Sequence, residues 1–355
     1  MEDEFQINEF PSVTVAIPVL NEEKHIRRVV EAFLRTEYPN LIEVLIADGG
    51  SSDRTREIVK ELSSEDARVK LVENPKKYQS YGLNRMIEVA EGDIFLRADG
   101  HCHYHKDYIE KCVSVMLKTG ARNVGGAQRY MAKNRVQAGI ALAVKSILGN
   151  GGAKYMNENF LGYADTVFLG CFKTSDLREI GGFNTENVTN QDSELNLRLI
   201  EKFGPTVYIS PEIKSWYYPR DSFVKLFKQY FRYGRGRFLT RTLHPRSSPI
   251  RGMVPFLSIL ILVVYSVTDA FTDSSLYSFQ ILTILALILI VESMRLVIVK
   301  KECFKEEIWN SDLPKPGYLS NLIATTISLI LMQFGHFFGF LYQLIKSGLR
   351  GKKGW

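Results

Sequence analysis

The sequence has few cysteines and no recognisable export signal. Its 355 residues include 4 cysteines, none in a Cys-x-x-Cys pair. This argues against a disulfide framework and favours a reducing compartment for the soluble part. The first ten residues are acidic and polar, so we expect no cleavable signal peptide and a cytosolic position for the bulk of the chain. No Gly-x-Gly-x-x-Gly follows the first predicted strand, which argues against a nicotinamide-binding Rossmann domain.

Charged residues are few or absent in three long segments near the C-terminus. Residues 253–271 carry only Asp269, residues 276–299 carry only Glu292 and Arg295, and residues 319–345 carry no formal charge. Each is long enough to cross a hydrocarbon core, which needs about 20 apolar residues. We therefore expect an integral membrane protein with three transmembrane helices. The alternative is three buried helices of a soluble domain.

The arrangement of basic residues gives the expected topology. A cytosolic catalytic domain sends the first span outward, and Lys300, Lys301 and Lys305 place the second connection inside. The third span then exports a basic tail, against the positive-inside rule. We expect a true third span with an exposed tail; the alternative is that the last segment does not fully cross.

Net charge is modest, with 45 basic and 39 acidic residues, but positive charge concentrates after residue 213. Aromatic and basic side chains alternate over residues 223–241. Such a segment superficially resembles a nucleic-acid surface. Because it lies directly before the first apolar segment, anionic membrane lipids explain it more simply, and we expect no nucleic-acid partner.

The N-terminal part alternates predicted strands and helices. Apolar runs at residues 13–18, 42–47, 69–72 and 94–97 are each followed by residues at helical spacing. A helix at 135–147 and a strand at 165–170 follow further along. This pattern predicts an α/β fold with a mostly parallel sheet and right-handed crossovers.

Polar residues at the strand ends are the candidates for chemistry. Asp99 and His101 follow the fourth strand, and the crevice of an open parallel sheet lies at that end. One carboxylate and one imidazole suit a divalent ion such as manganese, although both residues could instead cap the next helix. Asp48 ends the second strand without an obvious local partner, whereas Asp53 and Asp192 stand where helix caps also occur.

In their order along the chain, several motifs resemble those of the inverting glycosyltransferases of family 2. Residues 18–22 (Pro-Val-Leu-Asn-Glu) resemble the family's Pro-x-x-Asn-Glu, and residues 48–53 resemble its nucleotide loop. Residues 81–84 match its Ala-x-Asn helix start in part. The likeness is strongest to the membrane-bound, succinoglycan-type members, through Asp99-Gly-His101, residues 190–192 and residues 217–220. It covers roughly residues 11–240.

Two positions depart from the family pattern. Arg97 replaces the first aspartate of the usual Asp-x-Asp metal motif, and we hypothesise that it touches the diphosphate directly. Residues 229–233 resemble the Gln-x-x-Arg-Trp of cellulose and hyaluronan synthases, with tyrosine for tryptophan. In a helix Gln229, Arg232 and Tyr233 share one face.

The resemblance implies a GT-A fold and an activity. It implies transfer of glucose or mannose from a UDP- or GDP-hexose to a lipid-linked saccharide, with Mn²⁺ or Mg²⁺ as cofactor. Asp192 is expected to be the catalytic base, and Asp99 and His101 the metal ligands. Gln229, Arg232 and Tyr233 are expected at the acceptor or diphosphate. The expected donor-binding residues are Pro18, Asn21, Glu22, Asp48, Asp53, Asn84, Arg97 and Asp99.

The sequence leaves two other functions open. One is a processive polysaccharide synthase, although three helices are few for a polymer channel. The other is a non-catalytic nucleotide-sugar binder, which the replaced aspartate alone favours. The expected organisation is a GT-A domain at 1–220, amphipathic basic helices at 221–250, a transmembrane region at 251–346 and a basic tail at 347–355.

Overall fold

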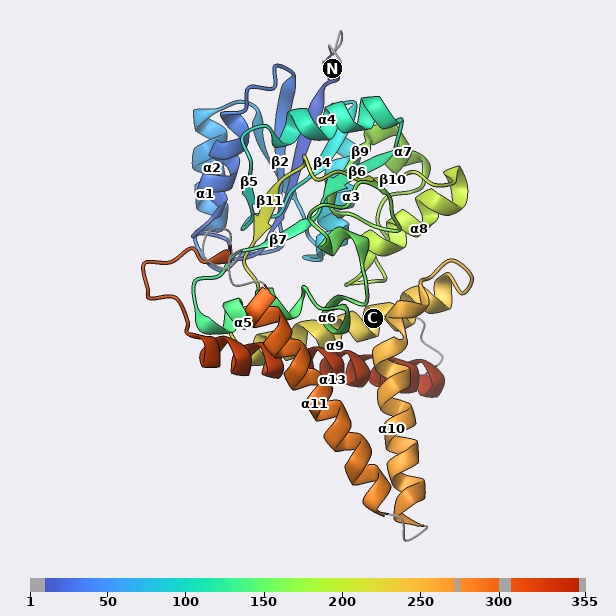
Figure 1. The fold of residues 1–355 in the computed structure, drawn as a ribbon. Coiled ribbons are helices and arrows are strands. Elements are labelled where there is room, and N and C mark those ends of the chain that lie inside the picture. The colour runs from blue at the N-terminus through green and yellow to red at the C-terminus, as the bar shows by residue number, and fades with distance from the viewer. Residues whose placement is uncertain (1–9, 272–274, 300–307, 351–355) are drawn as a thin grey trace. The chain divides into compact units, whose positions relative to one another are not determined.

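The computed structural model describes residues 10–271, 275–299 and 308–350 (Figure 1). The chain forms two compact units. The first comprises Met1–Arg129 and Asn157–Tyr217, and the second Tyr130–Met156 and Tyr218–Trp355. Residues 130–156, which the sequence analysis places in the N-terminal domain, therefore group with the C-terminal helices.

An eight-stranded mixed sheet forms the centre of the first unit, in the order β3-β2-β1-β4-β9-β6-β10-β8. Strands β3, β2, β1 and β4 are parallel, whereas β9 runs antiparallel to both β4 and β6. A second sheet has the order β5-β11-β7. The strands are β1 (Val13–Val19), β2 (Leu41–Asp48), β3 (Val69–Glu73), β4 (Ile94–Arg97), β5 (His103–Tyr104), β6 (Asn123–Gly126), β7 (Gln128–Tyr130), β8 (Gly162–Tyr163), β9 (Phe168–Lys173), β10 (Val207–Ile209) and β11 (Ser215–Tyr217).

Helices cover both faces of the large sheet. Along β1, Val13, Val15 and Ile17 join one apolar cluster and Ala16 joins the other. Burial on both faces explains why these strands read as continuous apolar runs. The first cluster includes α1 (Ile26–Leu34), α2 (Thr55–Glu65) and α4 (Tyr108–Thr119). The second includes α3 (Gln79–Val89), α7 (Thr174–Glu179) and α8 (Gln191–Phe203).

The parallel strands bring three polar loops to one edge of the sheet. The loops after β1, β2 and β4 all leave the carboxyl ends of adjacent parallel strands. Pro18 fits in β1 because the pairing with β4 ends at Ala16, so its missing N–H breaks no bond to β4. The predicted strands and strand-end loops are confirmed here. The predicted strand at 165–170 is shifted, because the paired residues are Phe168–Lys173.

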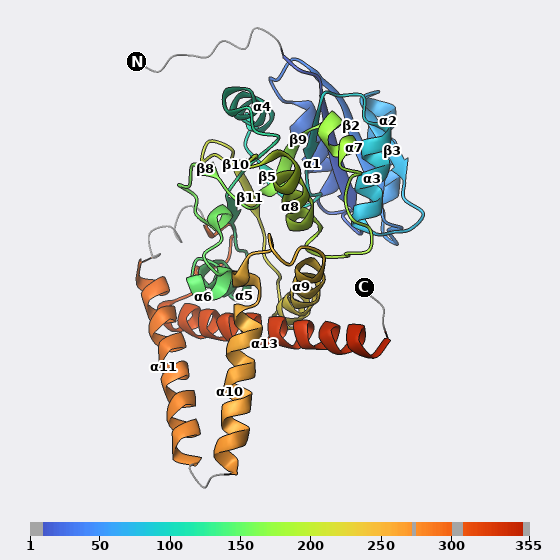
Figure 2. The same cartoon turned by 90° about the vertical axis from the view of Figure 1, so that its right-hand side faces the viewer.

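The second unit consists of helices. These are α5 (Arg135–Ala143), α6 (Ile147–Asn150), η1 (Lys154–Met156), α9 (Phe223–Leu243), η2 (Ile250–Gly252), α10 (Val254–Ala270), α11 (Ser275–Val299) and α13 (Tyr318–Arg350). The predicted helix at 135–147 is broken, because the Ser146 side chain caps α6 by accepting from the Leu148 N–H. Figures 1 and 2 show α10 and α11 side by side and α13 running across them.

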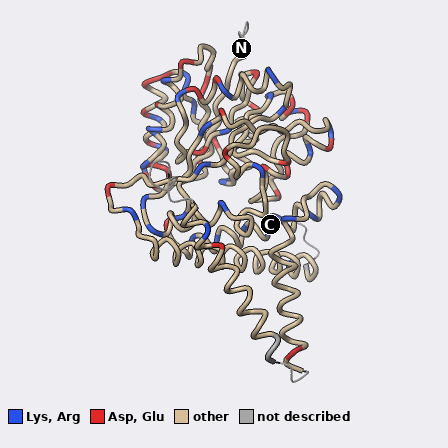
Figure 3. Tube along the Cα trace, viewed as in Figure 1, with Lys and Arg blue, Asp and Glu red and all other residues tan. Residues whose placement is uncertain are grey.

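By length and composition, two of the described helices could cross a membrane, at Ser278–Val299 and Tyr318–Leu349. Helix α10 is apolar and has 17 residues, the lower end of the roughly 17–25 residues that a span needs. In Figure 3 the α10–α11 pair is almost free of coloured charge along its length. The structure thus shows two long apolar C-terminal helices rather than the three that the sequence analysis expects.

Candidate active site

Two of the polar loops are bonded to each other. The Asn21 side-chain oxygen accepts a hydrogen bond from the Ser52 N–H at 2.8 Å, and the Asn21 N–H donates to the Ser51 hydroxyl at 2.8 Å. The Glu22 N–H donates to the Thr55 hydroxyl at 2.7 Å. Asn21 has φ 55° and Gly50 has φ 84°, left-handed values that asparagine and glycine tolerate. These contacts fix the loop after β1 against the loop after β2.

Asp48 and Asp53 both have local hydrogen-bond partners. The buried Asp48 carboxylate accepts from the Ser51 N–H at 3.1 Å and the Ser51 hydroxyl at 2.5 Å. The expectation that Asp48 lacks a local partner is therefore wrong, because its own loop turns back onto it. Asp53 accepts from the Thr55 N–H and from the Glu23 N–H. Although desolvation acts to raise the pKa of Asp53, these bonds hold it below its usual value.

Arg97 is the last residue of β4, and its side chain is buried beside Asp99 and Asp192. Its side chain is only 5% exposed, and its guanidinium forms ion pairs with Asp99 at 3.4 Å and with Asp192. Burial alone would lower the pKa of Arg97, but the adjacent Asp192 and Asp99 carboxylates outweigh it and leave the pKa raised. The guanidinium therefore stays charged between two carboxylates that are 93 positions apart in the chain.

Asp192 lies in the first turn of α8 and not at its cap. Asn190 is the N-cap residue, with φ 66°, and Asp192 presents a 35% exposed carboxylate beside Arg97. Asp99 is 17% exposed. A shared guanidinium thus brings the predicted base and the predicted metal ligand to the same end of the sheet. The sequence gives no signal for this contact.

His101 is held by Glu22. The His101 Nδ1 lies 2.7 Å from the Glu22 carboxylate, and the ring packs against Tyr217 at a centroid distance of 5.5 Å. A histidine that binds a metal through Nε2 commonly has its Nδ1 held by a carboxylate in this way. Glu22 is predicted from the sequence to bind the donor, and its contact with His101 is not predicted. A Pro-x-x-Asn-Glu loop gives no indication of it.

The donor set fits a divalent ion that is completed by substrate oxygens. Within the described residues, no group of three or more His, Cys, Asp or Glu side chains is placed to hold a metal by itself. Asp99 and His101 supply two donors on either side of the buried Gly100. Mg²⁺ commonly binds one or two carboxylates and takes its other ligands from phosphates and water. Asp99 and His101 would therefore need further ligands from the substrate and water to hold an ion.

Asn84 stabilises a turn. Its side-chain amide donates to the Phe183 carbonyl at 2.8 Å, and its oxygen accepts from the Phe183 N–H at 2.7 Å. A Cβ at Gly182, which has φ 67°, would clash with the Asn84 oxygen. Both ends of the amide are thus used within the protein, in the turn that precedes α8.

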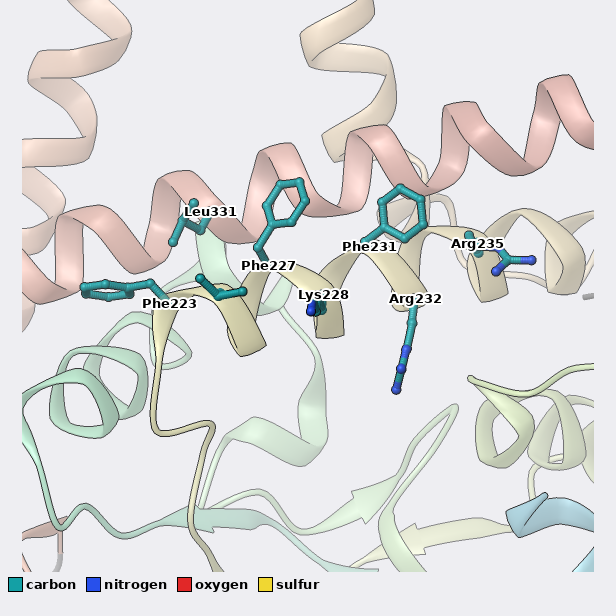
Figure 4. A pocket seen from close by; sticks show the side chains of 8 residues that line it. Phe223, Phe227, Lys228, Phe231, Arg232, Arg235 and Leu331 are labelled. Carbon is teal, nitrogen blue, oxygen red and sulfur yellow. The ribbon is translucent and has the colours of Figure 1, made fainter. Parts of the chain in front are cut away.

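Gln229, Arg232 and Tyr233 lie on α9 in the second unit. Gln229 and Tyr233 share one helix face, because the Gln229 amide donates to the Tyr233 hydroxyl at 2.8 Å. Arg232 lines a groove of about 740 Å³ along α9, together with Phe223, Val224, Phe227, Lys228, Phe231, Arg235 and Leu331 (Figure 4). The groove combines aromatic side chains with three cations.

Comparison with known proteins identifies the family. The protein family described as "Glycosyl transferase family 2" matches residues 14–174 of this chain. The succinoglycan biosynthesis protein ExoA of Rhizobium meliloti is 37% identical over 246 residues, which cover 69% of this chain and 74% of ExoA. The chain belongs to glycosyl transferase family 2. The predicted family is thereby confirmed, and this family 2 protein is a glycosyltransferase.

The chain is also similar to a further sequence relative and, in fold, to a solved structure. A Methanococcus voltae enzyme, named as a dolichyl N-acetyl-α-D-glucosaminyl phosphate 3-β-D-2,3-diacetamido-2,3-dideoxy-β-D-glucuronosyltransferase, is 32% identical over 64% of this chain and 73% of its own. The mannosyltransferase PcManGT of Pyrobaculum calidifontis, solved with GDP-Man and Mn²⁺, superposes with a TM-score of 0.63 at 16% identity. That superposition covers 96% of this chain and 89% of PcManGT, and it supports the GT-A-like fold of the family 2 chain.

Proposed function

We propose that this chain is a membrane-bound, inverting hexosyltransferase that moves glucose or mannose from a nucleotide diphosphate to a lipid-linked saccharide. The observation that carries the proposal is the position of Arg97 between Asp99 and Asp192. Because both carboxylates pair with one guanidinium, the general-base candidate and the predicted metal ligand lie next to each other. The named relatives that act on dolichyl-linked or GDP-linked sugars favour this substrate class.

Asp192 is the proposed base. Its exposed carboxylate accepts the proton of the acceptor hydroxyl, a contribution of typically about 10² to 10⁴-fold. The ion pair with the buried Arg97 guanidinium orients that carboxylate. This role replaces the hypothesis that Arg97 contacts the diphosphate directly. The buried guanidinium already pairs with two carboxylates.

Asp99 and His101 would hold Mn²⁺ or Mg²⁺, with Glu22 orienting the imidazole. The ion, when bound, neutralises charge on the departing diphosphate. Asn21, Asp48 and Asp53 act on the donor by shaping the nucleotide loop, and Pro18 lies in β1 one residue before that strand ends at Val19. Asn84 acts indirectly, through the turn at Phe183.

The groove along α9 is the proposed site for the lipid phosphate of the acceptor. Its aromatic side chains suit a prenyl chain, and Lys228, Arg232 and Arg235 suit the phosphate. In Figure 4, Phe227 and Phe231 point toward α13 and Arg232 points away from it. Apolar and charged parts of one ligand would thus meet different sides of α9. Gln229 and Tyr233, which are bonded to each other on the same helix, are the proposed contacts of the saccharide.

The test uses the full chain in detergent or nanodiscs, with labelled UDP- and GDP-hexoses, Mn²⁺ or Mg²⁺, and a membrane lipid extract. We expect transfer from one donor to a lipid product of a single added sugar. A ladder of long products would indicate a processive synthase, and donor binding with neither transfer nor hydrolysis would indicate a non-catalytic binder.

Asp192→Asn separates the base from the binding site. We expect at least about a 10²-fold loss of turnover with donor affinity retained, because only the proton acceptor is lost. The matched control is Asp221→Asn, an exposed carboxylate paired with Lys225 at 2.9 Å, which should keep full activity. Near wild-type turnover of Asp192→Asn would contradict the assignment.

Arg232→Gln tests the acceptor groove. Removing one charge-assisted phosphate contact should raise the KM for the lipid acceptor about tenfold, while hydrolysis of the donor alone stays unchanged. Arg246→Gln removes an exposed cation that does not line the groove and serves as the control. Equal effects of the two substitutions would contradict a specific phosphate site.

A further inference from the structure

Helix α13 is covered by protein along one face. The Gly335-x-x-x-Gly339 motif lies against α9, and a Cβ at Gly339 would clash with the Phe231 carbonyl. The Gln343 oxygen accepts from the Arg235 Nε at 2.9 Å. Nearer its start, α13 packs on α5, where a Cβ at Gly139 would clash with Ala324. In the most apolar stretch of α13, 50% of the residues are buried in the protein. In the corresponding stretch of α11, only 17% are buried.

Helix α9 is strongly basic. It is packed along α13, with Phe227 against Phe338 and Phe231 against Tyr342. A bilayer-spanning α13 would therefore draw α9 into the hydrocarbon, where each cation is costly. The cations of α9 are Lys225, Lys228, Arg232, Arg235, Arg237 and Arg241.

Helix α13 also carries a stripe of exposed apolar side chains, which borders the α9 contact at Phe338. The members of this stripe recur every four or seven residues and so lie on one side of the helix. They are Leu319, Ile323, Ile330, Phe334, Phe338, Ile345 and Leu349. Phe334 also lines an apolar groove of about 460 Å³ with residues of α10 and with Leu282 of α11. The stripe is therefore continuous with the apolar surface of the α10–α11 hairpin.

We propose that α13 lies in the plane of the membrane, with the stripe in the boundary between headgroups and acyl chains, while the α10–α11 hairpin crosses and returns. This inference rests on the proposed membrane anchoring. With 33 residues, α13 is about 50 Å long, well beyond the roughly 30 Å of hydrocarbon that a span must cross. It replaces the third span that the sequence analysis expects.

The proposal places the C-terminal tail on the side of the catalytic unit. Residues 218–222 join Tyr217 of the first unit to α9 and can extend at most about 18 Å, too little to cross a bilayer. Because α9 and α13 are packed together, both ends of α13 stay on that side. The basic tail and the basic connection between α11 and α13 are then expected on the same side of the membrane, as the positive-inside rule requires.

Cysteine labelling of the full chain in sealed membrane vesicles of both orientations tests the topology. The background carries Cys303→Ser, since Cys102, Cys112 and Cys171 are buried. Single cysteines replace Lys118 on α4 and Phe271 at the end of α10, both of them exposed, and Lys352 in the basic tail after α13. An impermeant maleimide should label Lys352→Cys from the same side as Lys118→Cys, and Phe271→Cys from the opposite side.

Two other labelling patterns would each contradict a different part of the proposal. Lys352→Cys and Phe271→Cys labelled together from the side opposite Lys118→Cys would overturn the in-plane helix and leave the anchoring intact. Phe271→Cys labelled from the Lys118→Cys side would instead overturn the membrane-crossing hairpin itself.

A depth measurement gives an independent readout. Spin labels at positions 319, 334 and 349 should report similar, shallow depths of about 5–10 Å below the headgroups. A profile that is deepest at position 334 and shallow at both ends would overturn the proposal.

Discussion

Replacing Arg97 by methionine removes the charge that joins the two sides of the candidate site. Methionine fills much of the same volume, so the change leaves little cavity in a position that is 5% exposed. What remains is a pair of carboxylates, Asp99 and Asp192, without their common partner. The substitution therefore tests whether Arg97 positions the base.

The expected loss of stability is moderate. Breaking a fully buried ion pair costs about 3–5 kcal/mol. Asp192 is 35% exposed and Asp99 17% exposed, so water screens both carboxylates once the guanidinium is gone. We therefore expect a loss of about 1–3 kcal/mol in the free energy of unfolding.

The expected loss of activity is larger. A misplacement of about 1 Å in a catalytic group can cost about 10²-fold, and Asp192 loses its orienting partner. We expect kcat at saturating donor and acceptor to fall about 10²-fold while the donor KM changes less than about threefold. Arg97→Lys, which keeps the charge but not the two-pronged geometry, should recover part of kcat.

The assay is the initial rate of transfer with the unfolding temperature measured on the same samples. Arg85→Met is the matched control, because Arg85 pairs with Glu88 at the surface of α3. A kcat close to that of the wild type would refute the positioning role. A large rise in the donor KM with kcat preserved would instead support direct contact between Arg97 and the diphosphate.

Two more predictions concern Glu22 and the glycines of α13. Glu22→Gln should weaken Mn²⁺ binding about 10- to 100-fold in calorimetry with the nucleoside diphosphate present, because His101 loses its orienting carboxylate; unchanged Mn²⁺ affinity with weaker nucleotide binding would place Glu22 on the donor instead. Gly339→Ala should lower the free energy of unfolding in detergent by about 1–3 kcal/mol through overpacking on α9. Gly348→Ala, on the same helix with nothing within 4 Å of its Cβ, should be neutral or slightly stabilising, and equal melting temperatures for the two variants would argue against close α9–α13 packing.

The sequence predicts the local parts of the first unit well. Strands buried on both faces read as apolar runs, and the polar residue after each run marks the edge where Asp48 and Asp99 lie. Helix periodicity and caps are properties of a few neighbouring residues, which is why these elements are predicted within a few positions. The position of Asp192 in the first turn of α8 is visible in the same way.

Contacts between distant segments could not be read from the sequence. The pairing of Arg97 with Asp192 depends on β4 and α8 ending at one place, and the pairing of His101 with Glu22 depends on the order of β1 and β4. The orientation of α13 is equally nonlocal. Its composition fits a membrane span, and its length and its packing on the basic helix α9 favour the proposed in-plane orientation instead.

The charge of the site explains why arginine can stand at the first position of the metal motif. Glu22, Asp99 and Asp192 carry three negative charges, and Arg97 carries one positive charge, so the cluster has a net charge of −2 with His101 neutral. An aspartate at position 97 would make it −4. Arginine at position 97 therefore leaves the protein side chains of the cluster two charges less negative than an Asp-x-Asp motif would. Since Arg97 also holds Asp192 near Asp99, the departure from the family motif is better explained as part of a working site than as a sign of lost activity.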